Sequence, residues 1–103
     1  MEEVRVYIIA NLQIHDADRY REYEKGFFPI LKKHEGDFIT FDDNIVHMEG
    51  DKPMEGRVIL LSFPSANHAE AWYSSEEYQT LSEHRWASVT TTLTRVSGMP
   101  PRK

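Results

Sequence analysis

The 103-residue sequence contains no cysteine. This excludes disulfide bonds and thiolate-bound metals, and it suits a reducing compartment. No apolar run reaches the roughly 20 residues that span a bilayer. The acidic start, MEEVRVYII, lacks a signal-peptide cleavage site. We therefore expect a cytoplasmic protein without a membrane partner.

The chain also lacks an excess of positive charge. Its formal net charge at pH 7 is −5, and acidic and basic residues are interspersed. Binding to a phosphate backbone needs a basic face, so we expect no nucleic acid partner. The length suits a single domain, which we place at residues 1–98, followed by a C-terminal tail at 99–103.

Common catalytic motifs are missing as well. The sequence has no G-x-S-x-G, no glycine-rich phosphate loop and no dinucleotide fingerprint. The five histidines form no H-x-x-x-H or H-x-H pair, so we predict no metal site and no bound cofactor. His47 lies in an apolar stretch and is a candidate for a buried base, although a hydrogen-bonded structural histidine is the commoner role.

Periodic patterns along the chain predict a β-α-β-β-α-β order, which is typical of a ferredoxin-like α+β sandwich with a four-stranded antiparallel sheet. The first strand covers residues 4–14 and alternates apolar side chains. A helix capped by Asp16 follows. Pro29 lacks an N–H group, so we expect a kink or break near residues 25–29. Gly36 is expected to end this helix.

The second half of the sheet is predicted from shorter segments. Residues 38–41 and 45–48 have strand character, and the Asp and Asn residues between them favour a turn. The segment RVILLSFP is the most strand-like, and the β-branched run VTTTLTRVSG forms the last strand. Glu49 and Arg57 flank the loop between the second and third strands, where we expect them to form a structural ion pair.

Apolar residues on both faces of two strands predict a homodimer. Tyr7 and Ile9 lie opposite the apolar face of the first strand, and RVILLSFP is apolar on both faces. Two helices cover only one face of such a sheet, so a monomer would expose the other. We expect two sheets to pack face to face around a twofold axis. Scattered surface hydrophobes on a monomer are the alternative.

The stretch FPSANHAEAWYSSEEYQTL concentrates aromatic residues on two short helices, which Ser65 and Ser75 can cap. Trp72 and Tyr73 are about 100° apart on a helix, so they face different neighbours. We expect Trp72 to pack on the sheet and Tyr73 to point toward the next helix or the dimer partner. For Tyr73 and Tyr78, core and pocket roles both stay open, because a buried phenol needs a hydrogen-bond partner.

Three polar side chains are predicted to converge. Tyr23 lies on the sheet-facing stripe of the first helix, and Tyr78 and Arg85 share a stripe on the last helix. If both helices cover one sheet face, the three side chains meet and can donate hydrogen bonds to an anionic or carbonyl oxygen. Alternatively, the phenols bond backbone groups and Arg85 pairs at the surface with Glu77, Glu83 or another acid. The predicted ligand-binding residues are Tyr23, Trp72, Tyr73, Tyr78 and Arg85, and the candidates for catalysis are His47, Tyr23 and Arg85.

The aromatic stretch also carries a family resemblance. FPSANHAEAWYSSEEYQ resembles the F-P-S, Ala, Trp-Tyr, Ser, Glu-Tyr-Gln pattern of a large bacterial family of domains of unknown function. The match spans roughly Val4 to Gly98 and includes DADRYREY, the MEG at 48–50, Arg57 and Arg85. It implies a stand-alone dimeric α+β barrel with the ferredoxin-like fold. It implies no reaction, because the wider superfamily holds cofactor-free monooxygenases, lactone isomerases, haem enzymes and ligand-sensing domains.

Two functions therefore stay open. The first is binding of, or action on, a small hydrophobic or carbonyl-bearing metabolite without a bound cofactor, in a pocket between helices and sheet. The second is a noncatalytic dimer that binds a ligand or a protein. A cavity with at least two perturbed titratable groups favours the first. A closed interior without convergent polar atoms favours the second.

Overall fold

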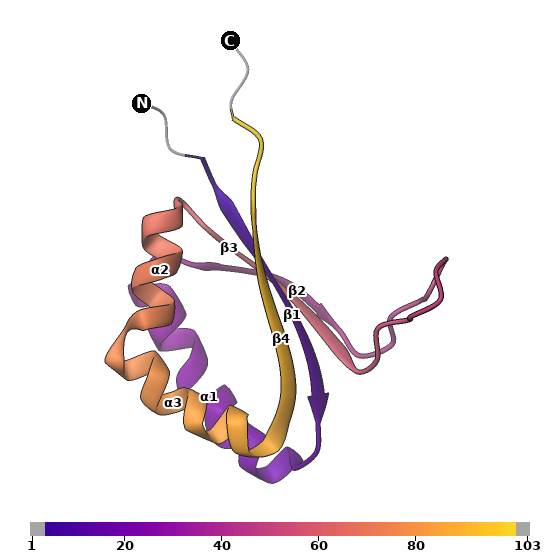
Figure 1. Cartoon of the computed structure of the whole chain (residues 1–103). Helices are drawn as coiled ribbons and strands as arrows, with labels where there is room; N and C mark the ends of the chain where they lie inside the picture. Colours follow the sequence, from indigo (N-terminus) through magenta and orange to yellow (C-terminus); the bar gives the residue numbers. More distant parts are fainter. Residues whose placement is uncertain (1–3, 101–103) are drawn as a thin grey trace.

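The computed structural model describes residues 4–100. The elements in chain order are β1 (Val6–Ile14), α1 (Ala17–Lys33), β2 (Asp37–Asp42), β3 (Arg57–Phe63), α2 (Ala66–Ser74), α3 (Glu76–Ser88) and β4 (Val89–Ser97). The strands form one antiparallel sheet in the order β2-β3-β1-β4. The helices lie on one face of the sheet (Figure 1). This is the predicted ferredoxin-like α+β arrangement, with the last helix divided into α2 and α3.

The core forms between the sheet and the helices. β1 is a central strand, and its side chains alternate so that every second one points to the helices. The four inward residues are at most 6% exposed: Val6, Ile8, Ala10 and Leu12. Helix α1 contributes four buried residues to the same core: Tyr20, Tyr23, Phe27 and Leu31. None of the helices within residues 4–100 is long and apolar enough to cross a membrane.

Helix α1 begins where the sequence predicts, because Asp16 Oδ1 accepts a hydrogen bond from the Arg19 backbone N–H at 3.1 Å. Of the kink or break predicted near residues 25–29, the break is wrong, since the helix runs without interruption through Pro29 to Lys33, and the kink stays a prediction. Buried Phe27 on one side of the proline anchors this turn to the core. Gly26 allows close packing of α1 against α3, because a Cβ there would lie 2.8 Å from Leu81 Cδ1.

Helix α1 ends in a left-handed turn as expected for a helix terminus, but at a different residue from the predicted one. Glu35, not Gly36, adopts the left-handed conformation, with φ at 61°. The Glu35 N–H donates to the Lys32 carbonyl at 3.0 Å, and the Gly36 N–H donates to the Leu31 carbonyl at 2.9 Å. This is the Schellman pattern, with glycine one position later than usual. Gly36 is needed for space, since a Cβ would overlap the side chains of Leu31 and Phe63.

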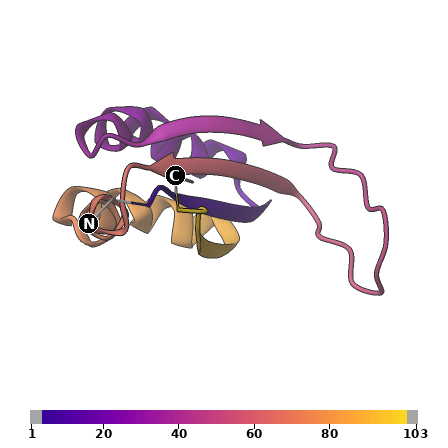
Figure 2. The same cartoon turned by 90° about the horizontal axis from the view of Figure 1, so that it is seen from above.

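The connection from β2 to β3 is a long loop. The predicted strand at 45–48 is wrong, because β2 ends at Asp42, whose partner Val58 lies near the start of β3. Beyond this point no neighbouring strand is available for pairing. Asp42 Oδ1 accepts the Asn44 backbone N–H at 2.8 Å, which turns the chain as predicted. Residues 43–56 then project away from the sheet (Figure 2).

The sheet face away from the helices is apolar in its centre, as predicted. The register places Ile9 beside Leu60 and Tyr7 beside Val96. Tyr7 is 36% exposed and Val96 is 42% exposed. The homodimer that this face suggests stays a prediction. The predicted tail at 99–103 follows the last strand, and its residues 101–103 lie outside the described part of the chain.

Candidate functional site

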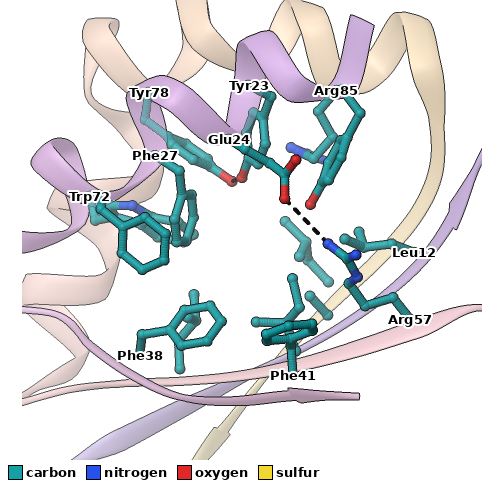
Figure 3. Close-up of a pocket in the computed structure, with 16 residues that line it drawn as sticks. Leu12, Tyr23, Glu24, Phe27, Phe38, Phe41, Arg57, Trp72, Tyr78 and Arg85 are labelled. Atoms are coloured by element: carbon teal, nitrogen blue, oxygen red, sulfur yellow. Dashed lines mark hydrogen bonds and ion pairs between the residues drawn. The ribbon is translucent and has the colours of Figure 1, made fainter. Parts of the chain in front are cut away.

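A cavity of about 190 Å³ lies between the helices and the sheet (Figure 3). Its apolar walls come from both layers: Ala10, Leu12, Phe27, Phe28, Phe38, Phe41, Ile59, Leu61, Trp72 and Leu93. Its polar lining comes from Tyr20, Tyr23, Glu24, Arg57, Tyr78 and Arg85. Phe28 and Phe41 are half exposed, so the cavity reaches the surface beside them. Few polar groups in an apolar cavity are typical of a small-molecule site.

Tyr23 and Tyr78 meet at one wall of the cavity. Their hydroxyl oxygens are 2.7 Å apart, and the side chains come from α1 and α3 (Figure 3). Burial, together with the neighbouring Tyr78, raises the pKa of Tyr23 well above its ordinary value. The phenol therefore stays protonated at neutral pH. Only one of the two hydroxyl protons is used between the tyrosines, so the second can be donated to a bound oxygen atom.

Arg85 is buried without a counter-charge. The residue is 3% exposed, and its guanidinium carbon lies 5.7 Å from the centroid of the Tyr23 ring. Within residues 4–100, no acid forms an ion pair with Arg85, and its Nε has no hydrogen-bond partner. The alternative prediction of an ion pair between Arg85 and Glu77, Glu83 or another acid is therefore wrong, and Glu77 pairs with Lys33 instead.

Arg57, by contrast, is fully paired at the rim. Its Nε donates to Asp43 Oδ1 at 2.6 Å and its Nη2 to Asp43 Oδ2 at 3.1 Å, while Nη1 lies 3.4 Å from Glu24 Oε2. The predicted ion pair between Glu49 and Arg57 is wrong, because the loop places Glu49 away from Arg57 and leaves Asp43 beside the start of β3. The Arg57 guanidinium lowers the pKa of Asp43, and Asp43 in turn raises the pKa of Arg57.

Two further aromatic residues shape the site. Trp72 is 1% exposed, and its ring centroid lies 4.2 Å from that of Tyr78, so it forms core and cavity wall at once. Burial raises the pKa of Tyr20 to about 12. Tyr20 and Tyr23 are thus two perturbed titratable groups in one cavity. Tyr73 is 45% exposed and outside the cavity lining, so the structure does not bring it into this group.

The histidine candidate lies far from this arrangement. His47 is exposed in the loop after β2, and its Nε2 lies 2.6 Å from the Gly50 carbonyl oxygen. The prediction of a buried base at His47 is therefore wrong, because the predicted strand around it does not form. Among residues 4–100, no three potential metal ligands gather in one place.

The structure brings Tyr23, Trp72, Tyr78 and Arg85 around one cavity, as the helix spacing predicts; their role in binding stays a prediction. Sequence reasoning missed Glu24, Phe38 and Phe41. The spacing of Tyr20, Glu24 and Phe27 on one helix stripe was available as a signal for Glu24. No local pattern distinguishes Phe38 and Phe41, since the register of β2 against β3 shifts between Phe38 and Thr40, and this shift determines which side chains face the helices.

The fold places the chain among small α+β proteins with one antiparallel sheet and helices on one of its faces. Residues 5–99 match the family named Domain of unknown function (DUF1330), and the chain belongs to it. No curated protein matches the sequence.

Several solved structures share the fold. A protein of unknown function from Rhodopseudomonas palustris is 15% identical, with a TM-score of 0.79 over 97% of this chain and 86% of that one. A variant of SnoaB, a cofactor-independent oxygenase from Streptomyces nogalater, is 9% identical, with a TM-score of 0.62 over 94% and 95%. An uncharacterised NIPSNAP-like domain protein from Burkholderia xenovorans is 14% identical, with a TM-score of 0.58 over 98% and 92%.

Proposed function

We propose that this protein binds a small hydrophobic metabolite bearing a carbonyl or acidic oxygen and acts on it without a bound cofactor. The observation that carries the proposal is the meeting of Tyr23, Tyr78 and Arg85 around one apolar cavity. Apolar walls hold the body of the ligand, and the three donors fix its oxygen. Two lining phenols with raised pKa values, Tyr20 and Tyr23, are the kind of perturbed groups that gather at functional sites.

The chemistry that suits these groups is stabilisation of negative charge on oxygen. Arg85 and a neutral phenol are donors that favour a negatively charged oxygen in a site of low dielectric constant, either a carboxylate or a carbonyl oxygen that gains charge during a reaction. Glu24 is the one acid among the described lining residues, and its carboxylate is the group that would take a proton from the ligand.

Chemistry without a cofactor is compatible with this scaffold. SnoaB, which shares the fold, is described as a cofactor-independent oxygenase. At 9% identity this likeness concerns the fold alone, so it shows only that such a fold can host chemistry without a cofactor and indicates no substrate.

A thermal-shift screen of small metabolites tests the proposal, because a ligand that binds only the native state raises its melting temperature. A true ligand should lose its effect in Ala10→Leu, which fills the cavity from β1. The matched control is Ala87→Leu on the exposed side of α3, which should keep the effect. A ligand that stabilises both variants equally binds elsewhere and would contradict the proposal.

A further inference from the structure

We infer that the ligand of this cavity is a monocarboxylic acid about the size of one aromatic ring, held with its carboxylate on Arg85. The inference rests on the proposed function, since it names the ligand class of the same site. Three features of the cavity lead to it: the unpaired charge of Arg85, the pairing of Arg57, and the volume.

The buried charge of Arg85 favours an anionic ligand. Arg85 is only 3% exposed, so its guanidinium loses most of its hydration. Such a charge is tolerated when an anion or strong acceptors compensate it. Among residues 4–100 it has only aromatic faces, those of Tyr23 at 5.7 Å and Trp86 at 6.0 Å. The guanidinium geometry matches a carboxylate, which accepts two parallel hydrogen bonds.

The hydroxyl pair beside Arg85 favours the same group. Tyr23 and Tyr78 share one hydrogen bond at 2.7 Å and leave one O–H proton for the ligand. A carboxylate has more acceptor positions than a guanidinium fork uses, so it can accept this proton as well. A neutral amide of the same shape offers only one oxygen to the guanidinium and would place its N–H group against the second donor of the fork.

The rim of the cavity limits the ligand to one negative charge. Arg57, the second cation of the lining, already binds Asp43 through two hydrogen bonds and lies 3.4 Å from Glu24. Its charge is therefore neutralised within the protein. A second anionic group on the ligand would meet the Glu24 carboxylate without a free partner.

The volume sets the size. The cavity of about 190 Å³ is slightly larger than the engineered 150 Å³ apolar cavity that takes up benzene. Phe27, Phe38 and Phe41 present ring faces and edges to it, which suits a flat ligand. A single ring with one carboxylate fits these limits.

NMR titration of the ¹⁵N-labelled protein with benzoate and with benzamide tests the inference, because the two probes have nearly the same shape and differ in charge. We expect benzoate to bind about 10- to 100-fold more tightly, as charge-assisted hydrogen bonds predict. Arg85→Met should weaken benzoate binding much more than benzamide binding and so remove this preference. Arg95→Met is the matched control, since Arg95 pairs with Glu70 outside the cavity. It should keep the preference.

The outcomes separate the inference from the proposed function. Equal binding of benzoate and benzamide to the wild type overturns the inference and leaves the proposed function intact. The same holds if the preference survives in Arg85→Met. If neither probe contacts the cavity residues, both fail. Should Arg85→Met not fold, Arg85→Lys replaces it, and a retained charge preference with weaker benzoate binding is then the expected result.

Discussion

Trp72 is the residue on which both the core and the cavity wall depend. Its ring packs against Phe63 and Tyr78, with centroid distances of 5.1 and 4.2 Å. Trp72→Ala should lower the free energy of unfolding by about 3–5 kcal/mol, because it empties a filled position. Trp86→Ala is the control, since Trp86 is 52% exposed, and it should cost less than about 1 kcal/mol. Urea unfolding measures both, and equal costs would contradict the assignment of Trp72 to the core.

The Tyr23–Tyr78 hydrogen bond can be measured by a double-mutant cycle. Tyr23→Phe or Tyr78→Phe alone leaves a buried hydroxyl without its partner, at a cost of about 1–3 kcal/mol. The double variant removes both hydroxyls, so it should cost clearly less than the sum of the single changes. Strict additivity of the three unfolding free energies would show that the hydroxyls do not interact in solution.

Tyr20 makes stability fall at high pH. Its pKa is about 12 in the folded protein, where burial disfavours the phenolate, against 10.0 for the free side chain. Between these values the unfolded chain releases the proton and the folded protein keeps it, so the contribution is complete below about pH 10 and is lost as pH rises toward 12. Urea unfolding at pH 9 and 11 should show a smaller loss in Tyr20→Phe, by about 1 kcal/mol. Identical losses would contradict this account.

At the scale of elements, we expect Pro29 to destabilise helix α1. The helix continues through it, although the proline cannot donate to the Lys25 carbonyl. Pro29→Ala should therefore raise the free energy of unfolding by about 2 kcal/mol, after allowance for the more flexible unfolded chain. The control is Pro64→Ala, which lies before the cap of α2 and should give no such gain. A destabilised Pro29→Ala would indicate that the proline is required.

The sequence predicts the helix starts well and the loop after β2 poorly. Asp16, Ser65 and Ser75 cap helices as expected, because capping needs only local hydrogen bonds. The segment 45–48 reads as a strand but has no partner, since β3 begins only at Arg57. Strand formation depends on a neighbour distant in sequence, and local propensity does not report it.

In the candidate site, too, local features were predictable from the sequence and features that depend on distant residues were not. Helix periodicity correctly places Tyr23, Tyr78 and Arg85 on stripes that face one another. Among the described residues no acid pairs with Arg85, and Arg57 pairs with Asp43. Both features follow from three-dimensional packing and were not predictable from spacing. His47 was misplaced because its environment depended on the strand that does not form.

At the scale of the whole molecule, we expect a homodimer that covers the apolar sheet face centred on Ile9 and Leu60. Light scattering across a concentration series should give twice the monomer mass. Leu60→Asp should produce a monomer, because it places a charge in the interface. Ala87→Asp, on the exposed side of α3, should remain dimeric. A wild-type monomer at micromolar concentration would contradict the expected assembly.

The central claim is that the cavity between helices and sheet holds the ligand. Methyl NMR of protein labelled at leucine and isoleucine, titrated with benzoate, tests it most directly. The cavity methyl groups should shift together: Leu12, Ile59, Leu61 and Leu93. Leu60 points to the opposite sheet face and should stay unchanged. Shifts at Leu60 without shifts in the cavity, or no shifts at any of these methyl groups, would contradict the account.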